Sequence, residues 1–282
     1  MRRGYAGTPE GQIHYTTAGG GEPLLLLHQT GSSRQYHKLL PLLAEKYRTI
    51  APDNLGSGNS DPLPPGVRIA DLARSMVHFM DALGIERSHL FGFHTGNKIA
   101  TEMAAAWPSR VDRLVLCGQT HSIMADHEAL NAALKAVVGP SLRTFEPEPD
   151  GSHLMKQWAA DFGVLANIWC GMSDVAREMP TAELLRWRRD RAVDHLQLRD
   201  VAEVYRAIFA FDLGARMRQI KARTLIIEVA TPDENHLGRQ GDKLVKLVPD
   251  SRLVTLEHTA GGMVVDAEAQ ELAWLILGFL GE

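Results

Sequence analysis

The sequence predicts an α/β fold with a mostly parallel, doubly wound sheet and one helical insertion. Over the first 120 residues, short apolar runs suited to buried parallel strands alternate with stretches whose apolar residues recur at helical spacing. The alternation stops near residue 121 and resumes near residue 212. In the first part, the glycine-flanked segment Gly92–Gly96 joins one such strand to one such helix through a very short turn. Together these features indicate a single sheet with helices on both faces and a separate group of helices above it.

Composition and charge limit the classes of protein and partner that are possible. The chain has 282 residues, 45% of them hydrophobic and 23% charged, which is typical of a soluble globular protein with one large core. The formal net charge of −4 and the lack of a long basic run argue against nucleic acid as a partner. No apolar run is long enough to span a bilayer and no signal-like segment follows Met1, so we expect a cytoplasmic protein without a membrane partner. Two cysteines imply no disulfide framework.

The expected elements follow in order along the chain. Expected strands cover residues 4–17 (two short strands with a turn at Gly11), 24–27, 47–51, 88–93, 111–117, 224–229 and 252–256. Expected helices lie around residues 39–43, 69–83, 97–107, 237–247 and 267–280. We therefore expect residues 1–120 and 212–282 to form the core and residues 121–211 to form a helical cap. Glu228 interrupts an apolar strand; it either pairs with a buried basic group or lies near the exposed end of the strand, and we favour the second.

The segment Gly92–Gly96 has a physical reason for its two glycines. A tight strand-to-helix turn brings its flanks together, so small residues must stand two positions before and after its tip. The tip here is His94. Its side chain is expected to project above the sheet, with the free N–H groups of the following helix behind it, where they stabilise a developing anion. Imidazole at this position is a candidate general base or nucleophile near neutral pH.

Over nearly its whole length the chain resembles the α/β-hydrolase fold superfamily. The run from Leu24 to His28 is similar to the strand that leads into that family's His-Gly oxyanion loop. The segment from Asp53 to Ser60 is similar to its Asp-x-x-Gly-x-Gly-x-Ser loop. The C-terminal order of strand, acid loop, strand and closing helix also resembles the family. The resemblance implies a hydrolase with a nucleophile, a histidine base and an acid that orients the base.

This chain departs from that pattern at two of the three positions. His94 stands where the family has its nucleophile, and Gly262 stands where it has its histidine base. His258, four residues earlier, is an alternative base if its loop brings it over His94. Asp233 falls at the acid position. We expect His94 and Asp233 to be the catalytic residues.

The expected pocket has further candidates. Gln29 replaces the glycine that the family pattern has after His28. Backbone N–H groups of Thr95 and of Gln29 or Thr30 are expected to form an oxyanion hole, or the Gln29 side chain donates to the substrate instead. We also place in the pocket group His121, which either lines the site or caps the first cap helix, and Trp169, which is a substrate contact or part of the cap core.

Two functions remain open from the sequence. The first is an enzyme on the hydrolase scaffold that cleaves a small, mostly apolar ester, lactone or C–C bond substrate without a serine, or a lyase or isomerase that only moves a proton. The second is a non-catalytic protein that binds a small molecule in the retained pocket. The loop Asp233–His236 carries two acids and one histidine but has no recognised ligand spacing, so we expect neither a metal nor a cofactor.

Overall fold

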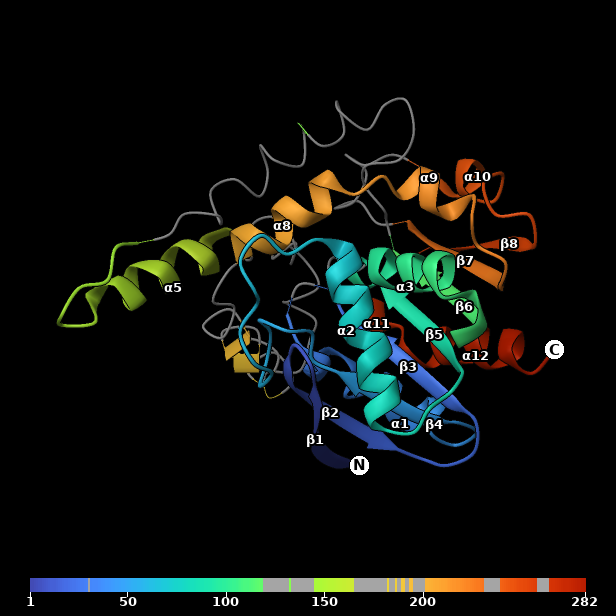
Figure 1. Ribbon diagram of the computed structural model, residues 1–282, viewed down its shortest axis with the longest axis horizontal. Helices are drawn as coiled ribbons and strands as arrows, with labels where there is room; N and C mark the ends of the chain where they lie inside the picture. The colour runs from blue at the N-terminus through green and yellow to red at the C-terminus, as the bar shows by residue number, and fades with distance from the viewer. Residues whose placement is uncertain are drawn as a thin grey trace.

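A computed structural model describes residues 1–29, 31–118, 145–164, 201–230, 239–257 and 264–282, together with residues 132, 182, 186, 189–190 and 193–194 (Figure 1). In these residues one eight-stranded sheet runs through the molecule in the order β1-β2-β4-β3-β5-β6-β7-β8. The strands are β1 Arg2–Thr8, β2 Gly11–Ala18, β3 Pro23–Leu27, β4 Arg48–Pro52, β5 Ser88–Phe93, β6 Val111–Cys117, β7 Arg223–Ala230 and β8 Ser251–Glu257.

The sheet is mostly parallel, as the sequence predicts. β1 pairs with β2, and β2 with β4, in antiparallel register, while every pairing from β4 through β8 is parallel. The inner strands β3 and β5 are covered on both faces, which explains why β3 carries a continuous apolar run and why every residue of β5 is buried. The carboxyl ends of β3, β5, β6 and β7 therefore lie at one edge of the sheet, where ligands bind in open α/β folds.

Helices pack on both faces of the sheet and define two apolar cores. Helices α2 and α3 lie in front of the sheet in Figure 1, and their apolar side chains join those of α8, α9 and α10 in one core. The other face is covered by α1, α11 and α12. The helices are η1 Ser33–Tyr36, α1 Leu39–Leu43, α2 Ile69–Ala82, α3 Thr95–Ala106, η2 Pro108–Arg110, α5 Ser152–Val164, α8 Val201–Ala210, α9 Leu213–Met217, α10 Gly241–Leu244, α11 Val264–Ala267 and α12 Ala269–Leu280.

The ends of α2 illustrate how local sequence fixes the elements. The Asp71 carboxylate accepts the backbone N–H of Arg68 at 3.0 Å and so satisfies a free donor at the helix N-terminus. Gly84 follows the C-terminus with a φ of +66°, a conformation that glycine adopts without steric cost. The predicted stop at this glycine is confirmed.

Between β6 and β7 the part of the chain that the structure describes contains helices and no strand. Helix α5 points away from the body of the molecule in Figure 1, and α8 leads back to the sheet through α9. The boundaries 121–211 for a separate cap stay a prediction. None of the helices in the described segments is long and apolar enough to cross a membrane.

Our expectation for Glu228 was wrong. The residue is only 6% exposed, and its Oε1 accepts the backbone N–H groups of Gln240 and Gly241, both at 2.7 Å. The carboxylate thus binds the start of α10, where the helix dipole favours a negative charge. Arg239, which is mostly exposed, lies 3.8 Å away and adds a weak ion pair.

Candidate functional site

His94 occupies the turn between β5 and α3. Its backbone has a φ of 49° and a ψ of −103°, and it is the single non-glycine residue with a positive φ among those that the structure describes. A Cβ atom on Gly92 would lie 2.6 Å from the carbonyl oxygen of Gly96, and one on Gly96 would lie 2.0 Å from that of Leu27. Both glycines are therefore required by the closeness of the turn to its neighbours, for the reason that the sequence predicts.

This conformation has an energetic cost. Residues held in sparsely populated backbone regions cost about 1–3 kcal/mol each and persist where the surrounding structure fixes them. Here α3 and the strands on both sides fix the turn. The amide side chain of Asn97 donates to the Cys117 carbonyl at 2.8 Å and accepts the Cys117 N–H at 3.1 Å, which binds the first turn of α3 to β6. Sequence reasoning did not identify this role of Asn97.

The His94 ring lies over the end of β6. It packs edge-on against Phe93 with ring centroids 4.4 Å apart, and the residue is 7% exposed. A Cβ atom on Gly118 would lie 3.0 Å from His94 Nε2, so the imidazole fills the space above this glycine. Gly118 itself donates to the carbonyl of Ile227 on β7 at 3.0 Å. The ring therefore lies at the carboxyl edge of β5 and β6.

His28 is a buried part of the loop after β3. Its Nε2 accepts the backbone N–H of Asn54 at 2.9 Å, so that nitrogen carries no proton and the proton is assigned to Nδ1. Nδ1 in turn donates to the backbone carbonyl of Gln29. Both ring nitrogens thus hold backbone groups, and His28 fixes the loop in which the sequence places the oxyanion donors.

Asp53 anchors the same loop from the side of β4. Its Oδ1 accepts the N–H of Ser33 at 2.8 Å, and its Oδ2 accepts from His14 Nδ1 at 2.8 Å and from the N–H of Asn59 at 3.0 Å. Burial by itself raises the pKa of Asp53, but the His14 hydrogen bond and the other donors outweigh it and lower the pKa to about 2. A Cβ atom on Gly58 would lie 2.2 Å from Oδ2, which explains why a glycine stands there.

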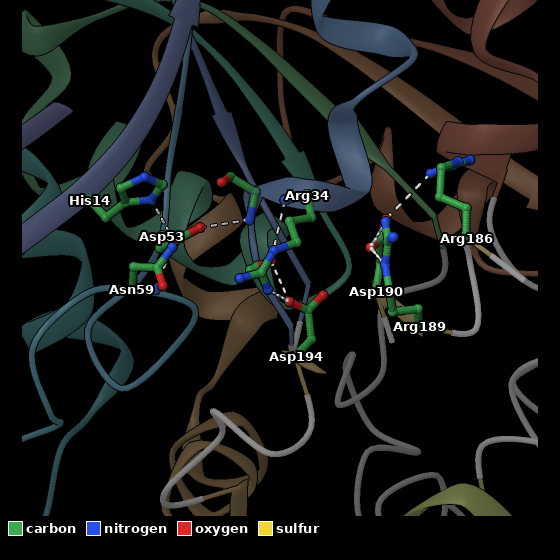
Figure 2. A network of polar contacts seen from close by, with 10 residues as sticks. His14, Arg34, Asp53, Asn59, Arg186, Arg189, Asp190 and Asp194 are labelled. Atoms are coloured by element: carbon green, nitrogen blue, oxygen red, sulfur yellow. Dashed lines mark hydrogen bonds and ion pairs between the residues drawn. The ribbon is translucent and has the colours of Figure 1, made fainter. Parts of the chain in front are cut away.

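A carboxylate from the segment between β6 and β7 reaches this loop as well. Asp194 is 3% exposed, and its Oδ1 accepts from Ser32 Oγ at 2.6 Å and from Arg34 Nη1 at 2.5 Å. Figure 2 shows Arg34 and Asp194 facing each other beside the contacts of Asp53 and His14. Two acids thus hold the loop: Asp53 from the core, and Asp194, which lies 162 positions after its partner Ser32.

Comparison with known proteins agrees with this architecture. A family model described as alpha/beta hydrolase fold matches residues 22–145. The chain is 29% identical over 261 residues to a 2-hydroxy-6-oxo-6-phenylhexa-2,4-dienoate hydrolase of Burkholderia cepacia, covering 86% of this chain and 82% of the relative. The structure of the enol-lactonase from Burkholderia xenovorans LB400 superposes with a TM-score of 0.75 at 21% identity, covering 99% of this chain and 100% of that one. A meta-cleavage product hydrolase from Pseudomonas fluorescens IP01 gives 0.70 at 21% identity, covering 99% of this chain and 97% of that one.

The chain has the α/β-hydrolase fold. The resemblance that the sequence motifs indicate is confirmed, as is the predicted fold class. Thr95 is the first residue of α3 and is 5% exposed, which places its N–H at the helix N-terminus directly after His94. Gln29 is half-buried next to His28.

The other predicted site residues lie outside the described residues. They are Thr30, His121, Trp169, Asp233 and His258, and Gly262 is among the undescribed positions too. Their roles stay predictions. In the described part of the chain no three His, Cys, Asp or Glu side chains gather in a group that could hold a metal ion.

One charged residue of α3 was not singled out from the sequence. Lys98, four positions after His94, is fully buried, and its Nζ has no hydrogen-bond partner among the described residues. Burial lowers the pKa of this amine from its ordinary value of 10.5 to about 7. Glu102, one turn further along α3, instead pairs with Arg216 of α9, whose Nε donates to it at 2.6 Å.

Proposed function

We propose that this protein is a hydrolase that cleaves a small, mostly apolar ester, lactone or activated C–C bond substrate, and that His94 takes the place of a serine in the chemistry. The observation that carries the proposal is the position of His94. A strained turn holds its imidazole at the carboxyl edge of the sheet, in front of the N-terminus of α3. A general base, the His94 imidazole, therefore lies next to a helix N-terminus that can stabilise an anion.

The proposed reaction is attack of water on a carbonyl carbon. His94 accepts a proton from the water, the water oxygen bonds to the carbonyl carbon, and the carbonyl oxygen becomes an oxyanion. The N–H of Thr95 and that of Gln29 or Thr30 stabilise this oxyanion. When the intermediate collapses, the bond to the leaving group breaks and the imidazolium returns its proton to the leaving group. Asp233, in the loop after β7, orients the imidazole in this scheme.

A second route gives the same products. The imidazole itself attacks the carbonyl carbon, the bond from that carbon to the leaving group breaks, and the leaving group takes up the proton that the acylated ring loses. Water then cleaves the acyl-imidazole, which hydrolyses readily, and this releases the acid and the free imidazole. Both routes need the His94 ring, and both differ from the serine route in that no stable acyl-enzyme forms. Burst kinetics separate them from a serine mechanism, since an accumulating acyl-enzyme releases the first equivalent of product in a burst.

The relatives suggest a substrate class. A 2-hydroxy-6-oxo-6-phenylhexa-2,4-dienoate contains a ketone, an enol and a carboxylate but no ester, so its hydrolysis must break a C–C bond next to the ketone. An enol lactone releases an enol oxygen when water opens it. In both reactions water attacks the carbonyl carbon, the bond from that carbon to the leaving group breaks, and the leaving group is stabilised as an enolate. We therefore propose a carbonyl compound with an enolate leaving group as the substrate of this protein.

The alternative is a protein that binds such a compound without converting it. Two features favour it: an imidazole stands where the family has its nucleophile, and Gly262 stands where it has its base. A lyase or isomerase that moves a proton with His94 is a variant of the first proposal, because the same base serves it.

A substrate panel separates these functions. The purified protein is incubated with p-nitrophenyl esters, an enol lactone and a 2-hydroxy-6-oxo-dienoate, and product release and the melting temperature are measured for each compound. The proposal predicts release of a carboxylic acid from at least one compound. A raised melting temperature without any product identifies a binding protein, and an isomer as product identifies a proton-transfer enzyme.

A further inference from the structure

We infer that Asp194 is a positioning residue for the reaction: a carboxylate from the segment between β6 and β7 sets the loop that carries the oxyanion donors. The inference rests on the proposed function for its catalytic meaning. Its structural content, the coupling of residue 194 to the loop after β3, stands on the contacts alone.

The contacts of Asp194 are directed at the loop. A single carboxylate oxygen, Oδ1, accepts from Ser32 Oγ at 2.6 Å and from Arg34 Nη1 at 2.5 Å. Ser32 also accepts the N–H of Arg34 at 3.3 Å and so begins the short helix η1. Ser32 is 1% exposed and Asp194 is 3% exposed, so water does not replace the bond between them when it is lost.

The rest of the loop is held by the core. His28 is bound to the N–H of Asn54, and the N–H of Ser33 is bound to Asp53. Both anchors come from the segment directly after β4. Asp194 is the one anchor in the described structure that comes from the insertion, and it acts on the side of the loop nearest η1.

This division of the anchors separates two effects. Without Asp194, the contacts of His28 and Ser33 still hold the loop in its general place, so the fold persists. The Ser32 hydroxyl and the Arg34 guanidinium, however, lose a charged partner, and the backbone between them gains freedom. Displacements of about 1 Å in a catalytic group cost about 100-fold in rate, so a loosened donor loop lowers the rate of the chemical step more than it weakens binding.

The test compares Asp194→Asn with Asp190→Asn. Asparagine keeps the size of the side chain and removes its charge. Asp190 lies four positions earlier in the same segment and contacts Arg186 and Arg189 rather than the loop, so it is the matched control. We expect Asp194→Asn to lower kcat by about 10- to 100-fold with KM changed by less than about 3-fold, and Asp190→Asn to leave both within about 2-fold.

The pair of Ser32 and Asp194 supplies a second comparison. If the Ser32 hydroxyl acts through the carboxylate, Ser32→Ala combined with Asp194→Asn lowers kcat less than the product of the two single effects. Independent, multiplicative losses would contradict the inference, as would an equal loss in Asp190→Asn or a rise in KM at constant kcat.

Hydrogen exchange tests the structural part without reference to activity. Peptides that cover residues 28–34 are expected to exchange faster in Asp194→Asn than in the wild type, with no such change in Asp190→Asn. Unchanged protection of these peptides overturns the inference. If the wild type hydrolyses no substrate while the exchange result holds, the proposed function fails and the coupling of Asp194 to the loop stands.

Discussion

Replacing Lys98 by methionine should stabilise the protein. The amine is fully buried in α3 and has no hydrogen-bond partner in the described structure, and burial lowers its pKa to about 7. The folded state therefore binds the proton less tightly than the unfolded state, in which the ordinary value of 10.5 applies. The cost of this burial is fully present below pH 7 and disappears as the pH rises from 7 to about 10.5.

The magnitude follows from the two pKa values. Each pH unit between them corresponds to about 1.4 kcal/mol of folding free energy, so the full cost below pH 7 is about 5 kcal/mol. At pH 7.5 it is about 4 kcal/mol, and at pH 10 it falls to about 1 kcal/mol. Methionine has a similar length, lacks the charge and tolerates an apolar site, so Lys98→Met removes the cost.

Urea unfolding of wild type and variant at pH 7.5 and at pH 10 measures the effect. We expect the variant to be more stable by several kcal/mol at pH 7.5, with a clearly smaller difference at pH 10. Lys246→Met, at an exposed lysine, should change the stability at neither pH. A Lys98→Met protein that is less stable than the wild type, or a difference that does not vary with pH, would refute the reasoning.

Three further predictions concern the site and its supports. Gly118→Ala should reduce the rate of hydrolysis at least 10-fold, because a Cβ at this position would lie 3.0 Å from His94 Nε2 and would displace the ring. Steady-state kinetics measure this loss, and full activity would contradict the placement of the His94 ring. Asp53→Asn should lower the free energy of unfolding by about 3–5 kcal/mol in denaturant titrations at pH 7, since it leaves buried donors without their charged partner, and a loss below 1 kcal/mol would be inconsistent with this role. The lowered pKa of Asp53 also means that its contribution is complete above about pH 4 and is lost as the pH falls towards about 2, so the stability of the Asp53→Asn variant should depend less on pH in that window. Glu228→Gln should lower the melting temperature by several degrees, because the start of α10 loses its negative charge; an unchanged melting temperature would mean that the backbone hydrogen bonds alone suffice.

The fold and the turn at His94 follow from local sequence. Apolar runs of strand length and helical periodicity give the alternation of elements, and the spacing of Gly92 and Gly96 gives the turn between β5 and α3. Each of these signals depends on a few neighbouring residues. The close approach of Gly96 to Leu27 shows that the glycine spacing also encodes one tertiary contact.

The supports of the site depend on residues that are far apart in the sequence. Asp53 binds His14, 39 positions away, and Asp194 binds Ser32, 162 positions away. Neither pairing has a periodicity or a motif that predicts it. Glu228 was misinterpreted because its partners are backbone groups at the start of α10, which begins at Gly241 rather than at the expected residue 237. Lys98 and Glu102, the two charged residues of α3, were the visible signal of unusual buried groups.

The most direct test of whether the His94 imidazole carries out the hydrolysis is the rate of His94→Asn beside that of the wild type. Asparagine tolerates a positive φ and cannot act as a general base, so the turn is retained while the chemistry is removed. With the panel compound that the wild type cleaves fastest, we expect His94→Asn to lose at least 100-fold in kcat and to melt within a few degrees of the wild type. Added imidazole should restore part of the hydrolysis rate. His78→Asn, at a half-exposed histidine of α2, should keep the wild-type rate. A His94→Asn protein that hydrolyses the same compound at the wild-type rate would contradict the claim that His94 carries the reaction.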